Sequence, residues 1–202
     1  MGRVSDAKQR LMDAVMALIW ESSYGSTTID AICEKAKVKK GSFYYFFDSK
    51  SDLASTALEA DWLTQKPELD SIFSPTALPL SRLQRFFEMV YQKQSELKLA
   101  RGRVLGCPLI TLGSEISTQD PRLCSVIQGL LGQYRRYFES AIRDAHGQGL
   151  IEAPDSMCKA KCLLHFFEGA LAEARIRNDV SLLKDLYVNA LDLMGVRPAL
   201  AA

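Results

Sequence analysis

Residues 27–53 read TTIDAICEKAKVKKGSFYYFFDSKSDL, and this stretch sets the architecture of the N-terminal part of the chain. Apolar residues recur at helical spacing from Ile29 to Ala36, and a second short helical pattern runs from about Lys39 to Phe46. A turn of two or three residues separates the two patterns. Two short helices joined by so short a turn are typical of a helix-turn-helix.

The rest of the sequence is also helical in pattern, with no convincing strand alternation. We expect a first helix that starts after Ser5 as its N-cap, a helix over residues 49–65, and a connection over residues 66–80, because prolines interrupt the pattern there. Further helices are expected from about 81 to 101, from Pro108 to about Ile116, and from Asp120 to about Gly147. The predicted fold is all-α.

Two final helices are predicted over about 155–178 and 181–194. The first is apolar or small on more than one side, which indicates a helix that packs both inside its own chain and against a partner. We therefore predict a two-fold homodimer built from these helices. Glutamate at Leu164 or Phe167 is expected to break it.

The composition is typical of a soluble globular protein: of 202 residues, 48% are hydrophobic and 24% charged. The net charge of +1 excludes wholesale coating of nucleic acid, so any DNA contact depends on local placement of basic residues. The sequence shows neither a membrane-spanning run nor a signal peptide, and we expect a cytoplasmic protein. Five scattered cysteines, an odd number, predict reduced thiols.

The 27–53 stretch resembles the signature of the TetR family of bacterial regulators. The matching residues are Thr27, Thr28, Ala36, Val38, Gly41, Phe43, Tyr44, Phe47, Ser49, Lys50 and Leu53. Two positions depart from the family pattern: Lys37 replaces the usual turn glycine, where a positive φ is often needed, and Phe46 replaces a polar ring. The resemblance implies a helix-turn-helix DNA-binding domain over 1–48, in a three-helix arrangement, and a helical ligand-binding and dimerisation domain over 49–202. It further implies a homodimeric repressor that a small-molecule effector releases from double-stranded operator DNA. The sequence itself leaves open an activator, or a ligand that promotes DNA binding.

The side chains of the signature are suited to DNA, since hydroxyl and basic groups can bond to phosphates and a short helix fits the major groove. The predicted DNA-binding residues are Thr27, Thr28, Lys39, Lys40, Gly41, Ser42, Tyr44, Tyr45 and Lys50. The alternative is a solvated basic face beside an ordinary core, and the signature favours DNA binding over it.

Aromatic and soft side chains are plentiful in the remainder and can line an apolar effector cavity. The predicted ligand-binding residues are Trp62, Phe86, Met89, Tyr91, Cys107, Tyr134, Tyr137, Phe138 and Phe166. Each of them can equally be an ordinary core residue. No cofactor, catalytic residue or metal site is predicted, and we expect no enzymatic activity.

Three alternatives stay open. Cys158, Cys162 and His165 share one helix face, which favours packing over metal binding because a fourth ligand is not evident. Cys107 lies between Gly106 and Pro108 at a helix start, where a thiolate would be stabilised, and it resembles the sensor cysteine of a thiol-using branch of the family; the alternative is a small buried side chain. The rival functions are a helical thiol enzyme using Cys107 with His146 or His165, and a ligand-binding module that has lost DNA recognition.

Overall fold

Every regular element in the described part of the chain is helical, as the sequence predicted. The computed structural model describes residues 2–196. In chain order the elements are α1 (Gly2–Glu21), α2 (Ile29–Ala36), α3 (Lys40–Phe46), α4 (Lys50–Ile72), α5 (Pro79–Arg101), α6 (Pro108–Ile116), α7 (Pro121–Gly147), α8 (Ser156–Arg177), the 3-10 helix η1 (Val180–Leu183) and α9 (Leu186–Met194). None of the helices within residues 2–196 combines the length and the apolar character needed to cross a membrane.

The chain divides into two compact units. The first unit comprises Met1–Gln65 and Pro108–Leu130, and the second comprises Lys66–Cys107 and Leu131–Ala202. The long helices α4 and α7 each contribute residues to both units, and α6 packs against α1. The expected functional domains 1–48 and 49–202 stay a prediction. The helix-turn-helix therefore shares its unit with α6.

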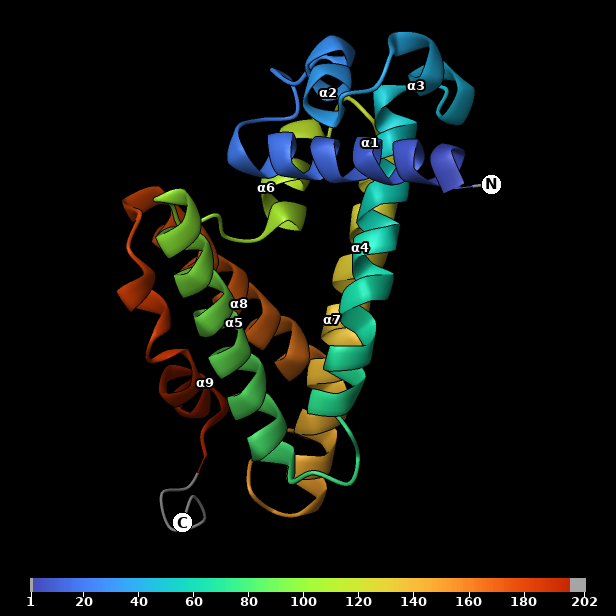
Figure 1. The fold of residues 1–202 in the computed structure, drawn as a ribbon. Helices are drawn as coiled ribbons and strands as arrows, with labels where there is room; N and C mark the ends of the chain where they lie inside the picture. The colour runs from blue at the N-terminus through green and yellow to red at the C-terminus, as the bar shows by residue number, and fades with distance from the viewer. Residues whose placement is uncertain (1, 197–202) are drawn as a thin grey trace. The chain divides into compact units, whose positions relative to one another are not determined.

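In the first unit, α2 and α3 pack against α1 (Figure 1). Each helix contributes apolar side chains at helical spacing to one core: Leu11 and Val15 from α1, Ile32 from α2 and Phe43 from α3 are fully buried. Burial of a side chain of this size stabilises the fold by roughly 1.5–3 kcal/mol. The short helices α2 and α3 are thus held by α1 and do not depend on their own helix propensity.

The turn between α2 and α3 adopts the geometry that the sequence predicted for a glycine. Lys37 has φ 54° and ψ 46°, in the left-handed region. Its N–H donates to the carbonyl of Glu34, and the N–H of Val38 donates to that of Cys33, which closes the end of α2. Arg10 of α1 adds a bond from Nη1 to the carbonyl of Ala36. The turn is therefore well bonded in spite of the strained lysine.

In the second unit, α5, α8, η1 and α9 lie side by side (Figure 1). Its largest buried side chain is charged: Arg82 forms an ion pair with Asp144 of α7 at 2.6 Å. The same guanidinium donates to the carbonyls of Ala77 and Pro75. Because all these partners satisfy it, Arg82 can stay buried, and it ties the start of α5 to α7.

Three predicted boundaries are wrong. α1 already begins at Gly2, so Ser5 lies inside it. α4 continues past Pro67 to Ile72. Pro67 leaves the carbonyl of Leu63 without a helical N–H, but both residues lie on an exposed side of the helix, where water can bind to this carbonyl. Residues 181–194 are not one helix, because the Asp179 carboxylate accepts from the N–H and hydroxyl of Ser181 and starts the tight turn η1 before α9.

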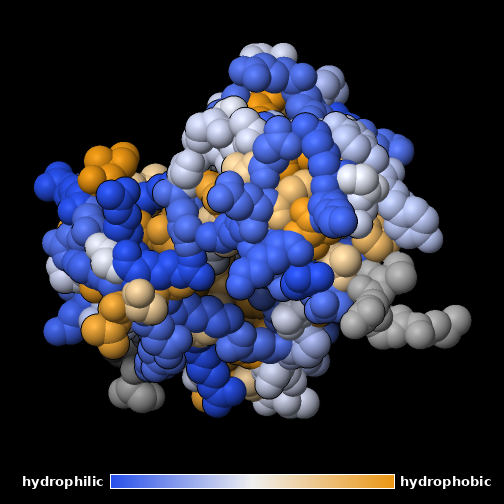
Figure 2. All heavy atoms as spheres, turned by 45° about the horizontal axis from the view of Figure 1, so that its top comes forward, coloured by the Kyte–Doolittle hydropathy of each residue, from blue (hydrophilic) through white to orange (hydrophobic). Residues whose placement is uncertain are grey.

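The residues proposed for breaking a dimer are also corrected. Leu164 and Phe167 are only 8% and 5% exposed, because they pack inside their own chain. The open side of α8 instead carries a stripe at alternating spacings of four and three residues: Cys158, Cys162, His165, Gly169, Ala172 and Ile176. Figure 2 shows one face of the molecule, where hydrophilic side chains dominate and hydrophobic atoms form separate patches.

Candidate DNA-binding and effector sites

The short helix α3 presents two aromatic side chains to solvent. Phe43 is fully buried and anchors α3, whereas Tyr44 and Tyr45 are 55% and 76% exposed. Tyr44 packs edge-on against Phe43, with ring centroids 5.2 Å apart. Gly41 is exposed, and a Cβ there would meet nothing within 4 Å. A surface of exposed tyrosines beside a side-chain-free position can approach the edges of bases closely.

Among the predicted basic contacts, Lys39 and Lys40 differ in their partners. Both are exposed, and Ser42 beside them is half-buried. The Lys40 ammonium forms an ion pair with Asp30 of α2 at 2.8 Å, and the hydrogen bond to Asp30 raises the pKa of Lys40. Lys39 precedes α3 as its N-cap residue. On these contacts Lys40 also links the two helices, whereas Lys39 is placed to reach outward.

The predicted threonine contacts lie at the start of α2 and use their hydroxyls internally. Thr28 is the N-cap of α2, and its Oγ1 accepts from the N–H of Ala31 at 3.1 Å. Thr27 is buried, and its hydroxyl donates to the carbonyl of Ser23 at 2.7 Å. Thr28 is exposed at the helix terminus. Of the two, Thr28 is the better placed for a phosphate.

Lys50, predicted to bind phosphate, is bonded to the turn between α1 and α2. Its Nζ donates to the carbonyls of Tyr24 at 2.7 Å and Thr27 at 2.8 Å. The ammonium also lies over the Tyr24 ring, 4.0 Å from the centroid. Burial lowers the pKa of Lys50, and the nearby Glu115 carboxylate opposes this. The lysine therefore has an internal role here, and its contact with DNA stays a prediction.

Glu115 of α6 holds the same turn from the other side and was missed in the sequence. Its carboxylate accepts from the N–H of Tyr24 at 2.8 Å and from that of Gly25 at 2.6 Å. A Cβ at position 25 would lie 2.9 Å from this carboxylate. The turn before α2 is thus bonded by an acid through its N–H groups and by Lys50 through its carbonyls. Only the glycine at position 25 is a sequence signal of this close approach.

An aromatic cluster fills the second unit. Phe86 lies at its centre, with ring centroids 5.0 Å from Phe138, 5.2 Å from Phe167 and 6.4 Å from Tyr134. Phe73 also contacts Phe86 and Phe138. The structure brings together three predicted ligand-binding residues, Phe86, Tyr134 and Phe138, and adds Phe73 and Phe167, which the sequence did not single out.

The other predicted effector residues are placed differently. Tyr137 packs against Phe73 and donates from its hydroxyl to Asp70 at 2.5 Å. The pKa of Tyr137 is raised, mainly by burial and in addition by the bond to Asp70. Met89, Tyr91 and Phe166 are half-buried in the second unit, outside the ring contacts just described. Trp62 is buried within the first unit. Their contact with an effector stays a prediction.

The loop that carries Cys107 is held rigidly. The Gln94 side chain is buried; its Oε1 accepts from the N–H groups of Leu105 and Gly106, and its Nε2 donates to the carbonyl of Gly106. Arg175 donates from Nη1 to the carbonyl of Leu105 at 2.6 Å. Gly106 has φ 66°, and a Cβ there would lie 3.2 Å from a backbone oxygen of α8, so glycine is required.

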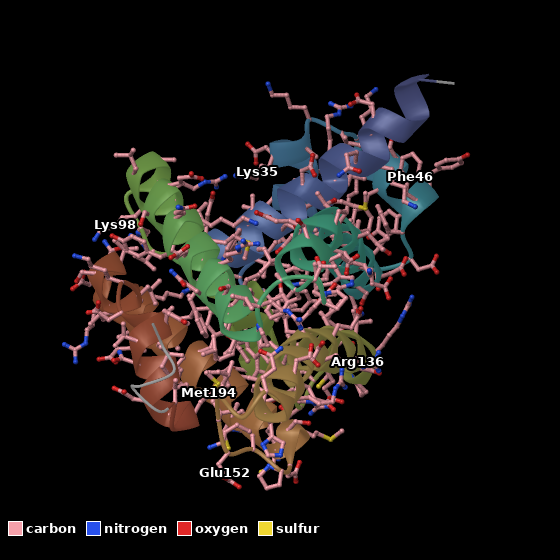
Figure 3. The ribbon with its side chains drawn as sticks, turned by 90° about the horizontal axis from the view of Figure 1, so that it is seen from below. Lys35, Phe46, Lys98, Arg136, Glu152 and Met194 are labelled. Carbon is pink, nitrogen blue, oxygen red and sulfur yellow. The ribbon has the colours of Figure 1, made fainter. Side chains whose placement is uncertain are left out.

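Asn178, which ends α8 in a left-handed conformation, holds the upstream part of this loop. Its side chain accepts from the N–H of Val104 and donates to the carbonyl of Gly102. Lys98 of α5, labelled in Figure 3, donates to the Asn178 carbonyl at 2.7 Å. Side chains of α5 and of the C-terminal end of α8 thus hold the backbone from Gly102 to Gly106, which fixes the backbone position from which the Cys107 side chain extends.

Beside Cys107 lies a buried acid that the sequence did not reveal. Glu168 of α8 is 8% exposed, and the Cys107 thiol forms a hydrogen bond with its carboxyl group. Burial raises the pKa of Glu168 to about 7, and the thiol bond opposes this in part. Arg101 and Arg103, which the sequence placed near Cys107, are exposed. The thiol thus has an acid as a hydrogen-bond partner.

The alternative metal and thiol sites gain no support from the geometry. Cys158, Cys162 and His165 are exposed on α8, and within residues 2–196 no group of three potential ligands is arranged to hold a metal. His146 bonds through Nδ1 with the backbone of Ile151 and Ala153 at the end of α7.

Comparisons with known proteins agree with the helix-turn-helix. Residues 11–57 match the profile of bacterial regulatory proteins of the tetR family, and residues 79–187 match that of the tetracyclin repressor-like C-terminal domain. The chain is 29% identical over 174 residues to the transcriptional regulator AcuR of Cereibacter sphaeroides, covering 84% of this chain and 77% of that protein. It is 23% identical to the transcriptional repressor DhaR of a Mycobacterium species, covering 85% and 84%.

Solved structures show the same fold. The regulatory protein TetR from Rhodobacter sphaeroides superposes with a TM-score of 0.80 at 27% identity, over 91% of this chain and 96% of that one. The reduced form of E. coli NemR superposes with a TM-score of 0.82 at 17% identity, over 96% and 99%.

Proposed function

Because this chain belongs to the tetR family of bacterial regulatory proteins, we propose that it is a homodimer that binds operator DNA through α2 and α3 and releases it when a small-molecule effector occupies the second unit. The family consists of transcription regulators, which are not enzymes. Bacterial operator DNA lies in the cytoplasm, and the proposed activity is placed there.

The observation that carries the DNA-binding part is the exposure of Tyr44 and Tyr45 on a helix anchored by buried Phe43. Large aromatic side chains on a soluble protein are normally buried, and adjacent exposed ones favour an interaction surface. Lys39 and Lys40 next to them supply positive charge for phosphates, although the whole chain carries a net charge of only +1. The charge at this surface is local, as binding to DNA requires.

The dimer is supported by the open side of α8. The stripe from Cys158 to Ile176 includes Gly169, where a Cβ would meet nothing within 4 Å of its own chain, and Ile176, which is 83% exposed. On α9, Val188 is 56% exposed. Small and apolar side chains at helical spacing on an open face suit the isologous packing of a second copy.

Effector action is proposed as a population shift. An effector that binds another arrangement of the dimer more tightly than the DNA-competent arrangement lowers the affinity for the operator. The difference between its affinities for the two arrangements sets the size of this decrease. The aromatic cluster around Phe86 supplies the apolar body of such a site. Electrophile sensing by Cys107 stays a prediction, tested by comparing operator release by N-ethylmaleimide in wild type and Cys107→Ser.

The DNA-binding proposal is tested by fluorescence anisotropy with the DNA that flanks the protein's own gene, over a series of salt concentrations. Lys39→Ala should weaken binding and reduce the slope of log affinity against log salt by about one, because one phosphate contact is lost. Lys184→Ala removes an exposed lysine next to η1 and should change neither. Equal behaviour of the two variants would contradict the proposed surface.

Lys50→Ala separates two roles in the same assay. If the lysine acts through the Tyr24–Thr27 turn, as its hydrogen bonds indicate, affinity falls and the salt slope is retained. If it binds a phosphate directly, the slope also falls by about one. Normal operator binding by this variant at physiological salt would show that Lys50 has neither role.

A further inference from the structure

Glu168 is an exception among the buried polar side chains of the second unit. Arg82 has an ion pair and two carbonyl partners, and Gln94 makes three hydrogen bonds to the loop before α6. Glu168 has only the Cys107 thiol, a weak hydrogen-bonding group, and its Oε2 is buried without any hydrogen-bond partner among the described residues. A buried polar atom left in this state destabilises the fold, so its presence calls for a functional reason.

Among the described residues, no basic group compensates the charge of Glu168. On α8 its neighbours one turn away are the buried Leu164 and Leu171. Arg175, seven residues along the same helix, lies about 10 Å further along the axis and bonds to the loop. The pKa of Glu168 responds to burial and to Cys107, with no contribution from a basic group. Burial therefore keeps about half of the acid protonated at pH 7, and this form carries a donor proton for which the described residues supply no acceptor.

Glu168 follows a member of the aromatic cluster in the sequence of α8 and bonds to the Cys107 thiol. Phe167, the preceding residue, belongs to the aromatic cluster through its contact with Phe86. Cys107, its thiol partner, is held by the loop that Gln94 and Arg175 fix, and it directly precedes α6 in the chain. A polar group of this kind beside apolar side chains is what orients a small molecule in a site.

We propose that the Glu168 carboxyl, together with the Cys107 thiol, is the polar recognition point of the effector site, and that it binds an uncharged acyl oxygen such as that of an amide, ester, ketone or aldehyde. This inference rests on the proposed effector function of the second unit. An acyl oxygen accepts the proton of the neutral acid and satisfies it. An anionic ligand would meet a carboxyl group without a balancing cation, and a cationic ligand would require two charges to be buried together.

The first test is thermal unfolding without ligand. Glu168→Leu removes an unsatisfied acid at similar volume and should raise the unfolding midpoint by about 2–6 °C. Gln94→Leu is the matched control, because it removes a buried polar side chain whose Oε1 and Nε2 are both hydrogen-bonded, and it should lower the midpoint. A Glu168→Leu protein that unfolds at lower temperature than wild type would make the acid a structural residue and overturn the proposal.

The second test measures binding of three probes with one carbon skeleton by ligand-observed NMR in the absence of DNA: cyclohexanecarboxamide, cyclohexanecarboxylate and cyclohexylmethylamine. The amide should bind best. Its affinity should fall at least tenfold in Glu168→Leu and stay within about threefold in Glu168→Gln, whose N–H also donates to an acyl oxygen. Preference for the amine or the carboxylate, equal affinity in the Leu variant, or no binding of any probe would each overturn the inference. Operator binding, measured separately, is unaffected by these outcomes.

Discussion

The hydrogen bonds between Glu115 and the turn before α2 predict the effect of removing the Glu115 side chain. In Glu115→Ala the N–H groups of Tyr24 and Gly25 lose a carboxylate acceptor at 2.8 and 2.6 Å. A hydrogen bond to a charged group contributes about 1.5–3 kcal/mol, but the Gly25 N–H is exposed and water can replace its acceptor. The part-buried Tyr24 N–H carries most of the loss. We therefore expect a decrease of about 2 kcal/mol in the free energy of unfolding.

The assay is urea unfolding followed by circular dichroism, with hydrogen exchange of the peptide that covers residues 22–28. Glu115→Gln retains one acceptor oxygen and should lose about 1 kcal/mol. Glu96→Ala, an exposed glutamate of α5, is the control and should stay within 0.5 kcal/mol of wild type. If Glu115→Ala also stays within about 0.5 kcal/mol and the Tyr24 and Gly25 amides exchange as in wild type, the turn does not depend on α6.

Three further predictions concern single positions. Burial raises the pKa of Glu168 from 4.5 to about 7. The contribution of this side chain to the free energy of unfolding is therefore fully present below pH 4.5 and is lost as the pH rises through 7. The free energy of unfolding of Glu168→Gln relative to wild type should accordingly increase by about 2–3 kcal/mol between pH 5 and pH 8, and a difference that is flat with pH would show that the fold does not raise the pKa of the acid. Lys37→Gly should stabilise the protein by about 1 kcal/mol in urea unfolding, because Lys37 has φ 54°; a loss of stability would mean that the turn does not strain the lysine. Gly169→Glu should convert the dimer to monomer in sedimentation at micromolar concentration, whereas Gly129→Glu on α7, also with open space at its Cβ, should leave it dimeric; a monomeric wild type would refute the α8 interface.

The sequence predicted the helix-turn-helix well, because its signals are local. Gly41, the apolar spacing of Ile32 and Phe43, and the left-handed turn at Lys37 all depend on residues a few positions apart. Pro67 misled the prediction, since whether a proline ends a helix depends on solvent access to the carbonyl that it leaves unbonded.

The site residues were harder to predict because their partners are distant in the sequence. Glu115 is 90 residues from Gly25. Glu168 is one of several charged residues on α8, and the sequence does not distinguish it from the exposed ones such as Glu173. Lys50 matched a family signature, but its partners at Tyr24 and Thr27 appear only in the fold. Periodicity places a residue on a face of its helix, and tertiary packing determines which group that face meets.

Sequence-specific recognition of DNA through α3 is tested by selecting duplexes from a random library with the full-length protein and titrating the enriched site by anisotropy. The account predicts a two-fold symmetric site, with half-sites about one helical turn or a multiple of it apart. Tyr45→Ala, which alters a side chain that is 76% exposed, should fold normally and fail to enrich this site. Enrichment of no sequence, of a site without two-fold symmetry, or of the same site by the Tyr45→Ala protein would contradict the account.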